Sequence, residues 1–261
     1  MTVCTLASSS SGNCTVVSSG ATHILIDAGI SMRRIKDGLR MFGLALENIS
    51  CVFVTHDHND HINGAATLTK YYKTPLFMSY GTANGIRCAF PETDPYINCF
   101  ETGVEFGFGD FSASSFPTPH DAAGSVGFTF RAHGAKMVYA TDLGYVSAEV
   151  FEASLGADLA IIEANHDRDR LRNGPYPAYI KRRILSEYGH LGNTESGDLA
   201  ARLAVSGSRY IQLSHLSREN NTPELAREAA NKAFIACGLA PGKDAVLDVA
   251  PPYAPGRVYE L

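Results

Sequence analysis

The sequence predicts a single domain, residues 1–261, of the mixed class in which strands and helices alternate (α/β or α+β). Short apolar runs typical of buried strands alternate with segments whose apolar residues recur at helical spacing. Neither a low-complexity linker nor a repeat interrupts the 261 residues. Polar residues able to bind metal follow the apolar runs several times, which is usual where a site lies at one edge of a sheet.

The first 79 residues predict strands and turns with two helices between them. Thr- and Val-rich runs flank the turn SSSSGN, which indicates a hairpin. Apolar residues at helical spacing, followed by Gly43, indicate the first helix. The predicted strands cover residues 4–19 (the hairpin), 23–29, 51–56 and 74–79, and the predicted helices cover 31–44 and 62–73.

The rest of the chain repeats this alternation. Apolar runs ending in polar residues indicate strands, and the last helix is bounded by a Thr222 cap and by Gly238. The predicted strands cover residues 104–108, 111–118, 127–132, 136–144, 158–167 and 209–217, and the predicted helices cover 196–205 and 222–238.

Composition is that of an ordinary soluble globular protein, with 45% hydrophobic and 19% charged residues. No apolar run approaches the roughly 20 residues that a membrane span needs, and the N-terminus lacks the pattern of a secretory signal. Six scattered cysteines with no CxxC pair read as reduced thiols, so we expect a cytoplasmic protein without a membrane partner.

The net charge of −5 argues against binding to nucleic acid through the overall field of the protein. One segment is locally basic, and Tyr176 and Tyr179 lie within it. It suits a DNA backbone as well as it suits an ordinary solvated helix face. Its basic residues are Arg168, Arg170, Arg172, Lys181, Arg182 and Arg183.

The strongest motif is His-x-His-x-Asp-His at the end of the predicted strand 51–56. His56 and His58 can face one ion, while Asp60 and His61 can face a second, and Asp57 is the spare acid of the loop. Imidazole and carboxylate together suit zinc, manganese or iron rather than calcium.

Four ligands are too few for two ions, and the remaining candidates also follow strands. They are His120, Asp142 and His215. Taken singly, each has an ordinary alternative, because a lone histidine is often a hydrogen-bonded structural residue and Asp142 could cap a turn. Only the set as a whole favours metal binding.

In the order of these motifs the chain resembles the metallo-β-lactamase-fold hydrolases over nearly its whole length. This resemblance implies a four-layer αββα sandwich that binds two divalent ions. It implies that Asp142 bridges the ions and that Asp27 supports the ligand histidines from behind. The implied ligands are His56, His58 and His120 for the first ion, and Asp60, His61 and His215 for the second.

Five segments look like those of the YycJ (WalJ) group within that superfamily, which are bacterial proteins regarded as 5′-to-3′ DNA exonucleases. The resemblance therefore implies a phosphodiesterase that acts on DNA through a hydroxide held between two ions. Lactamases of this fold use a cysteine where this chain has Asp142, which disfavours β-lactam hydrolysis. The segments are SSSSGNC, FPTPHDAAGSVGF, EANHD, GHLGN and LSHLSRENNTPELA.

We expect His190 and Asp60 to act in catalysis, His190 as a proton donor. A histidine that merely caps a turn before Gly192 is the alternative. His166, which follows a strand, and Asn13, in the early turn, are candidate substrate-binding residues together with the basic segment.

Three other functions remain open at this stage. A small cyclic phosphodiester would use the same metal chemistry. A thioesterase of the glyoxalase II type would need an added helical domain, and this chain has only a short helical tail after His215. A non-catalytic metal-binding protein is disfavoured, because every expected ligand position is intact.

Overall fold

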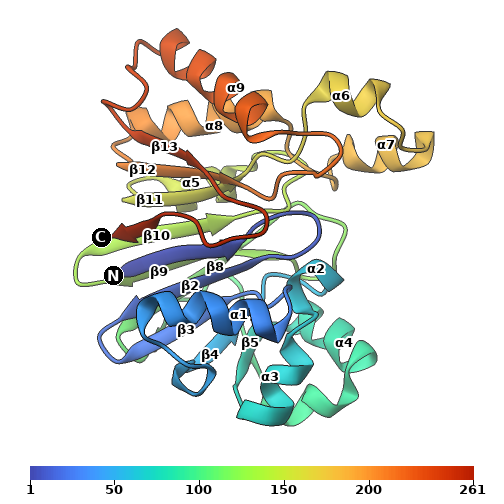
Figure 1. Ribbon diagram of the computed structural model, residues 1–261, viewed down its shortest axis with the longest axis vertical. Helices are drawn as coiled ribbons and strands as arrows, with labels where there is room; N and C mark the ends of the chain where they lie inside the picture. Colours follow the sequence, from blue (N-terminus) through green and yellow to red (C-terminus); the bar gives the residue numbers. More distant parts are fainter. The chain divides into compact units, whose positions relative to one another are not determined.

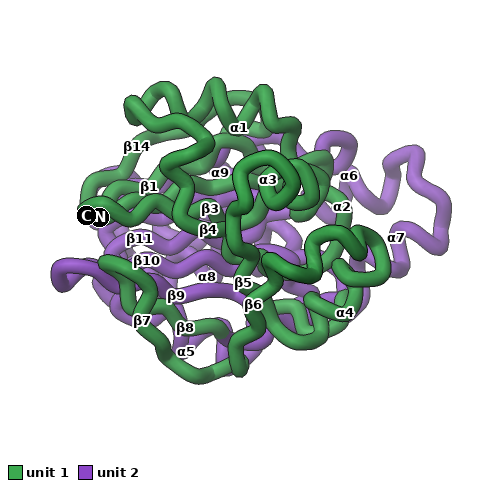
Figure 2. The backbone as a smooth tube through the Cα atoms, turned by 90° about the horizontal axis from the view of Figure 1, so that it is seen from below, with its two compact units in different colours: residues 1–115, 122–126, 251–261 green, residues 116–121, 127–250 purple.

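The computed structural model describes residues 1–261, which fall into two units, each with a mixed β-sheet (Figure 2). Unit 1 comprises residues 1–115, 122–126 and 251–261, and unit 2 comprises residues 116–121 and 127–250. None of the helices combines the length and the apolar character that crossing a membrane requires.

The sheet of unit 1 has the strand order β14-β1-β2-β3-β4-β5-β6. Strands β3 to β6 run parallel, while β14, β1, β2 and β3 pair antiparallel in sequence. An antiparallel hairpin is formed by β7 and β8. The bounds are β1 Thr2–Ala7, β2 Cys14–Ser19, β3 Thr22–Ile26, β4 Cys51–Phe53, β5 Leu76–Ser79, β6 Ile97–Phe100, β7 Phe106–Phe108, β8 Phe111–Pro117 and β14 Val258–Glu260.

Four helices belong to unit 1 (Figure 1), and buried residues of each lie in one core with residues of its sheet. Ile35 of α1, Leu68 of α3 and Ile86 of α4 share one buried core with Leu25 and Val52 of the sheet. The helix expected over 62–73 is confirmed as α3, whereas the short α2 before it and α4 were not predicted. The bounds are α1 Met32–Leu39, α2 Asn59–Ile62, α3 Ala65–Tyr72 and α4 Tyr80–Ala89, with short 3-10 turns at Arg40–Phe42, Leu46–Asn48 and Pro91–Tyr96.

In unit 2 the strands follow the order β13-β12-β11-β10-β9. Strands β10 to β13 run parallel, and β9 pairs antiparallel with β10. Leu199 and Leu203 of α8 and Phe234 of α9 share one buried core with Ile162 and Leu213 of the sheet. Figure 1 shows α8 and α9 beside strands β12 and β13. The strands are β9 Val126–Ala132, β10 Ala135–Ala140, β11 Leu159–Glu163, β12 Tyr210–Ser214 and β13 Val246–Val249, and the helices are α5 Ala148–Ser154, α6 Arg168–Asn173, α7 Ala178–Ile184, α8 Asn193–Val205 and α9 Pro223–Ala236.

Parallel strands explain why polar side chains gather within each unit. In unit 1, Asp27 follows β3 and His56 follows the neighbouring β4. In unit 2, Asp142 and His215 follow β10 and β12, and Glu163 ends the β11 strand between them. Because parallel strands end at the same edge, each unit presents one cluster of titratable side chains at its sheet edge.

Candidate metal centre

The cluster of unit 1 comes from the loop and short helix after β4. The rings of His56 and His58 lie 4.6 Å apart between centroids, and those of His56 and His61 lie 4.1 Å apart. Asp60 Oδ2 lies 3.5 Å from His61 Nε2. Three imidazoles and one carboxylate are therefore gathered within residues 56–61. They form the donor set expected of a transition-metal site.

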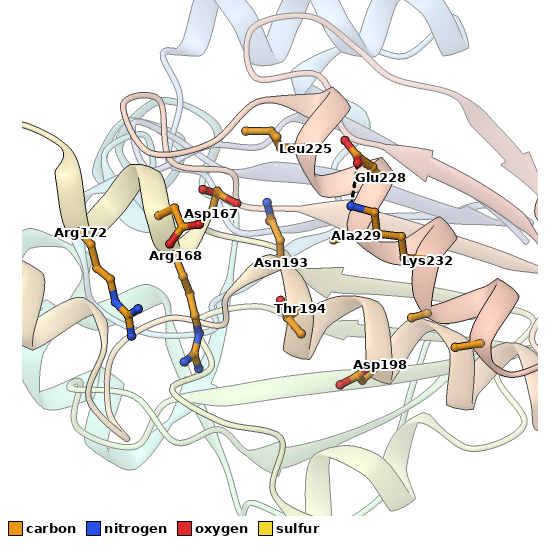
Figure 3. Close-up of a pocket in the computed structure, with 13 residues that line it drawn as sticks. Asp167, Arg168, Arg172, Asn193, Thr194, Asp198, Leu225, Glu228, Ala229 and Lys232 are labelled. Atoms are coloured by element: carbon orange, nitrogen blue, oxygen red, sulfur yellow. Dashed lines mark ion pairs between the residues drawn. The ribbon is translucent and has the colours of Figure 1, made fainter.

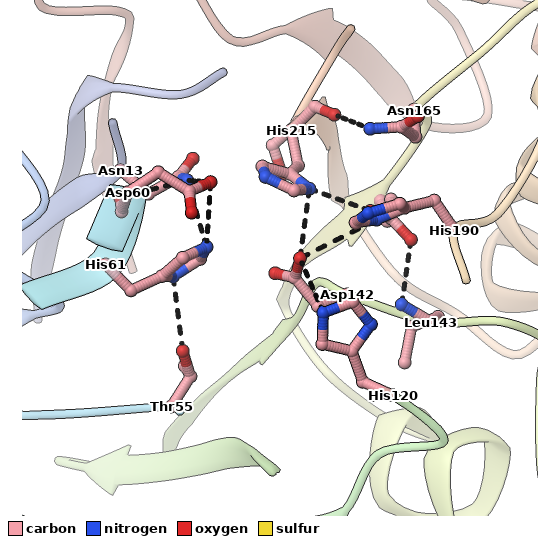
Figure 4. A network of polar contacts seen from close by, with 12 residues as sticks. Asn13, Thr55, Asp60, His61, His120, Asp142, Leu143, Asn165, His190 and His215 are labelled. Carbon is pink, nitrogen blue, oxygen red and sulfur yellow. Dashed lines mark hydrogen bonds and ion pairs between the residues drawn. The ribbon is translucent and has the colours of Figure 1, made fainter. Parts of the chain in front are cut away.

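Asp27 holds this cluster in place through hydrogen bonds to Thr55 and His61. Its buried carboxylate accepts hydrogen bonds from the Thr55 backbone at 2.8 Å and from His61 Nδ1 at 2.7 Å. The Thr55 hydroxyl lies 3.0 Å from Nδ1 of His56 (Figure 4 shows Thr55 beside His61). Burial raises the pKa of Asp27, and His61 and Thr55 partly offset that effect. Because Nδ1 of both histidines is engaged, Nε2 is the atom that each would offer to a metal.

Asp27 also has a left-handed backbone conformation, with φ of +60°. Asp142 and His215 share this feature, with φ of +62° and +56°. Such values cost free energy for residues other than glycine and are concentrated at functional sites, where the surrounding structure enforces them. All three residues are buried and come directly after or close to a strand end.

Asn13 binds the candidate ligands of unit 1 directly. Its side-chain oxygen accepts a hydrogen bond from Ser9 N at 3.1 Å, which fixes the orientation of the amide. Its Nδ2 lies 3.1 Å from His61 Nε2 and 3.5 Å from Asp60 Oδ2. The turn SSSSGN thus reaches the metal-binding loop, which is a closer role than contact with substrate alone.

Asp57, the spare acid of the motif, packs on helix α4. A Cβ built on Gly85 of α4 would lie 1.8 Å from Asp57 Oδ2, so the helix can approach the loop only because residue 85 is glycine. The aspartate therefore fixes the loop and is not a ligand candidate.

The cluster of unit 2 centres on Asp142 (Figure 4). Asp142 Oδ1 lies 3.7 Å from His120 Nε2, 3.3 Å from His215 Nδ1 and 3.7 Å from His190 Nδ1. Ligand-type atoms of Asp142, Glu163, His190 and His215 all lie within 4.8 Å of one another. A divalent cation would offset the negative charge that two buried carboxylates place here.

Glu163 was not predicted as a site residue. It is the last residue of the apolar strand β11, a position similar to that of Asp142 just after β10. Its Oε1 accepts hydrogen bonds from Nδ1 of both His190 and His215, each at 2.8 Å. Its Oε2 accepts from the backbone N–H groups of Leu143 and Leu191 at 2.8 and 2.9 Å. Burial alone would raise the pKa of Glu163, but His190 and His215 outweigh it and lower that pKa to about 2. The residue is therefore a buried carboxylate anion.

These contacts set the ring orientation of the histidines in unit 2. Nδ1 of His215 is held by Glu163, and Nδ1 of His120 is 3.0 Å from the carbonyl oxygen of Gly189. As in unit 1, Nε2 is left as the metal-binding atom. Ligand histidines of metalloproteins are commonly held through their other nitrogen by a carboxylate or carbonyl in this way. The residues present therefore fit divalent metal ions.

The basic segment forms two short helices, α6 and α7, which we call the arm (residues 168–184). Arg168 pairs with Glu195, Arg183 pairs with Asp121, and the Lys181 ammonium binds the carbonyls of Arg172 and Gly174. Half of its cations are thus used to hold the arm in place. Three exposed arginines form no ion pair with protein carboxylates, namely Arg170, Arg172 and Arg182.

A cavity of about 620 Å³ separates α6 from α8 and α9 (Figure 3). Arg168 and Arg172 lie at one side of it, and Glu228 and Lys232 of α9 pair at the other. Its lining mixes both signs of charge, so it does not extend the positive surface of the arm.

His166 is buried and 2% exposed, and burial lowers its pKa to about 4. The ring is therefore neutral near pH 7, which suits a hydrogen bond better than an ion pair with phosphate. It lines a second cavity together with His190.

Comparison with known proteins gives three kinds of similarity. The model of the "Beta-lactamase superfamily domain" matches residues 22–213. Exodeoxyribonuclease YycJ of Bacillus anthracis is 33% identical over 256 residues, covering 97% of this chain and 96% of the relative. Exodeoxyribonuclease WalJ of Streptococcus pneumoniae is 34% identical over 255 residues, covering 94% and 93%.

Two solved structures are similar along the whole chain. The metallo-β-lactamase-fold protein YhfI of Bacillus subtilis has a TM-score of 0.72 at 17% identity, covering 99% of this chain and 98% of its own. Zn²⁺-bound PqqB of Methylobacterium extorquens has a TM-score of 0.71 at 20% identity, covering 100% of both chains. At these identities the similarity concerns the fold.

Proposed function

The chain belongs to the β-lactamase superfamily, and we propose that within it the protein is a two-metal phosphodiesterase that degrades DNA from an end. Membership confirms the expected αββα fold and establishes a metal-dependent hydrolase that binds divalent metal. The DNA substrate and the 5′-to-3′ direction are our proposal, supported by the exodeoxyribonuclease names of the relatives from Bacillus anthracis and Streptococcus pneumoniae.

The proposal includes two divalent ions, and Asp142 is the residue that we assign to both of them. Support comes from the Nδ1 hydrogen bonds, which leave Nε2 as the donor atom in His120 and His215. In His61 the Nε2 atom contacts the Asn13 amide at 3.1 Å, so a bound ion would replace that contact. The Zn²⁺-bound state of PqqB, a protein of the same fold, supports zinc as one candidate beside manganese and iron. The proposed ligands are His56, His58 and His120 for one ion and Asp60, His61 and His215 for the other.

The single observation that favours phosphodiester cleavage is the pair His190 and Glu163. Bound divalent ions activate water and stabilise charge that develops on an attacked phosphate. His190, which is 13% exposed and 3.7 Å from Asp142, is placed to protonate the leaving oxygen. Its Nδ1 is held by the Glu163 anion, so Nε2 can carry and release a proton while Glu163 stabilises the imidazolium.

Replacement of His190 by alanine tests this donor role. We expect turnover on DNA to fall about 10²-fold, the lower range for loss of a general acid. Turnover on bis-p-nitrophenyl phosphate should change little, because p-nitrophenolate leaves without protonation. Measuring kcat for both substrates in the same metal buffer checks the difference. An equal loss on both substrates would show that His190 acts in binding metal or in folding.

The arm is the proposed contact surface for the DNA backbone. Its three unpaired arginines and the exposed ring of Tyr179 (64% exposed) offer cations and a stacking surface in one segment. A protein of net charge −5 needs such a local positive surface in order to hold DNA.

Replacing Arg170, Arg172 and Arg182 together by alanine should weaken DNA binding without altering turnover of bis-p-nitrophenyl phosphate. Because each arginine is expected to neutralise one phosphate, removing all three should reduce the slope of log Kd against log salt by about 2 to 3. Binding of a labelled 5′-phosphorylated duplex at several salt concentrations measures that slope. A matched triple variant of exposed cations elsewhere, Arg33, Lys36 and Lys243, should leave it unchanged.

The proposed function itself is tested by a substrate panel with the metal-loaded protein. We expect cleavage of bis-p-nitrophenyl phosphate and stepwise degradation of 5′-phosphorylated DNA, with slower cleavage of RNA and cyclic nucleotides. Hydrolysis of the simple diester without any degradation of DNA would reject the exonuclease. Preference for a cyclic nucleotide would favour the small-molecule phosphodiesterase, for which the same ligand sets suffice.

We also propose a cytoplasmic location, supported by the six cysteines, which are all free thiols.

A further inference from the structure

Unit 2 contains a cavity of about 330 Å³ that begins at His190. It extends from that ring toward the N-terminal turn of α8 and the loop that follows Asp142. Its volume is within the range of sites for small organic groups. No step of the proposed cleavage uses the interior of this cavity.

One wall of the cavity is apolar and partly aromatic. Tyr145 is 48% exposed and Leu185 is 42% exposed, although both are large hydrophobic residues, and Val146 lies beside them. Tyr145 lies three residues after Asp142, on a loop anchored by the hydrogen bond from Gly144 N to the Pro119 carbonyl at 2.8 Å. A tyrosine ring on a loop anchored in this way provides a flat surface on which a nucleobase can stack.

The floor of the cavity is polar and incompletely hydrogen-bonded. Nδ1 of His166 and Oε2 of Glu195 have no hydrogen-bond partner in the protein, although Oε1 of Glu195 binds Arg168. Buried polar atoms without partners are unfavourable, so these two favour a bound molecule that supplies hydrogen bonds. The burial that keeps His166 neutral lets its ring offer one donor and one acceptor.

Gly192 keeps this floor open. A Cβ built there would lie 2.8 Å from Glu195 Oε2 and 3.4 Å from His166 Nε2, so even a methyl group would occupy the space between them. The backbone of Gly192, with φ of −78° and ψ of 164°, suits any residue. The benefit of glycine at this position is therefore space and not backbone freedom.

From these features we propose that the cavity receives the terminal nucleobase of the strand being degraded. The base stacks on Tyr145 and its N–H groups donate to Glu195, while His166 binds a neighbouring edge atom. With the base in the cavity, the adjacent phosphodiester lies at His190. This assignment rests on the proposed function, since it identifies the substrate group that the same site holds.

The test uses Tyr145→Ala and Gly192→Ala in the full metal-loaded protein. The substrates are 5′-phosphorylated DNA with a normal terminal nucleotide, the same DNA with an abasic terminal nucleotide, and bis-p-nitrophenyl phosphate. Tyr145→Ala removes the stacking surface and Gly192→Ala fills the floor of the cavity. Each change should lower kcat/KM for the normal DNA by about 10- to 100-fold. Both variants should cleave abasic DNA and the simple diester at the wild-type rate. Tyr71→Ala, which removes an exposed tyrosine of unit 1, is the matched control.

An equal loss on normal and abasic DNA, or no loss on either, would overturn the assignment.

Failure of the wild-type protein to cleave any DNA would reject the proposed function instead. In that event, inhibition of bis-p-nitrophenyl phosphate hydrolysis still tests the cavity. Deoxynucleoside 5′-monophosphate should then inhibit the wild type more strongly than deoxyribose 5-phosphate does, and both variants should lose this difference. Equal inhibition by the two compounds in the wild type would overturn the assignment.

Discussion

Replacing Asp142 by alanine should remove nearly all hydrolytic activity, on DNA and on bis-p-nitrophenyl phosphate alike. Asp142 is 2% exposed and lies within 3.7 Å of three histidine nitrogens. It is also the one residue that we assign to both ions, so its loss affects both. We expect turnover to fall by at least about 10³-fold, the equivalent of the several kcal/mol of charge stabilisation that metal ions supply.

Two quantities check this prediction, namely the metal content per chain and kcat on bis-p-nitrophenyl phosphate. We expect metal content to fall together with activity. Asp37→Ala, which removes an exposed carboxylate, should change neither quantity. Full turnover by the Asp142→Ala protein would reject the two-metal mechanism.

The backbone at Asp142 offers a control for loss of folding. With φ of +62°, the residue has a conformation that glycine adopts without strain. Asp142→Gly should therefore be more stable than Asp142→Ala, by about 1 kcal/mol, while being equally inactive. Thermal unfolding of both variants in metal-free buffer checks the order. A glycine variant that is less stable than the alanine variant would show that Asp142 has no backbone strain to relieve.

The parts of this site that could be predicted from sequence are those encoded by local pattern. Asp27, His56, Asp142 and His215 follow short apolar strands, and the parallel pairing of those strands brings their ends to one edge within each unit. Apolar runs are visible over five or six residues, so the strands and the residues after them can be found without knowing any tertiary contact.

Features that depend on distant partners could not be predicted in the same way. Glu163 ends the strand β11, but its partners His190 and His215 are 27 and 52 residues away in sequence. A single acid at a strand end has no motif to distinguish it from a surface residue. The sequence did not decide the structure of the arm for a related reason, since α7 buries only Ile184 and so has no apolar periodicity.

Replacing Glu163 by glutamine should disable the site, although the two side chains have nearly the same shape. The carboxylate accepts four hydrogen bonds, two from histidine Nδ1 atoms on Oε1 and two from backbone N–H groups on Oε2. Glutamine has only one oxygen and an NH₂ group that cannot accept. Whichever way the amide turns, one pair of N–H donors faces another donor.

The backbone N–H groups of Leu143 and Leu191 cannot change, so the glutamine oxygen should turn toward them. Its NH₂ group then faces His190 and His215, and each ring must present an unprotonated Nδ1. The proton moves to Nε2. That atom is the one that His215 would offer to a metal ion. His190 would need a second proton, on Nδ1, in order to become the imidazolium that can donate from Nε2. We expect weaker metal binding by about 10- to 100-fold and, with the proton donor impaired as well, a fall in turnover on DNA of about 10³-fold.

Titration of the metal-free protein with Zn²⁺ measures the first effect, and NMR of the histidine ring nitrogens reports the tautomer directly. Gln212→Glu, a reverse exchange at a buried position on β12, is a poor control because it would bury a new charge. The better comparison is Asp158→Asn, which alters a carboxylate of the same unit that accepts a backbone N–H from Lys136 and binds no ligand histidine. The contrary result would be a Glu163→Gln protein that keeps Nδ1–H on both rings and binds Zn²⁺ with normal affinity. That result would show that the carboxylate does not orient the histidines, and it would reject a catalytic role for the pair Glu163 and His190.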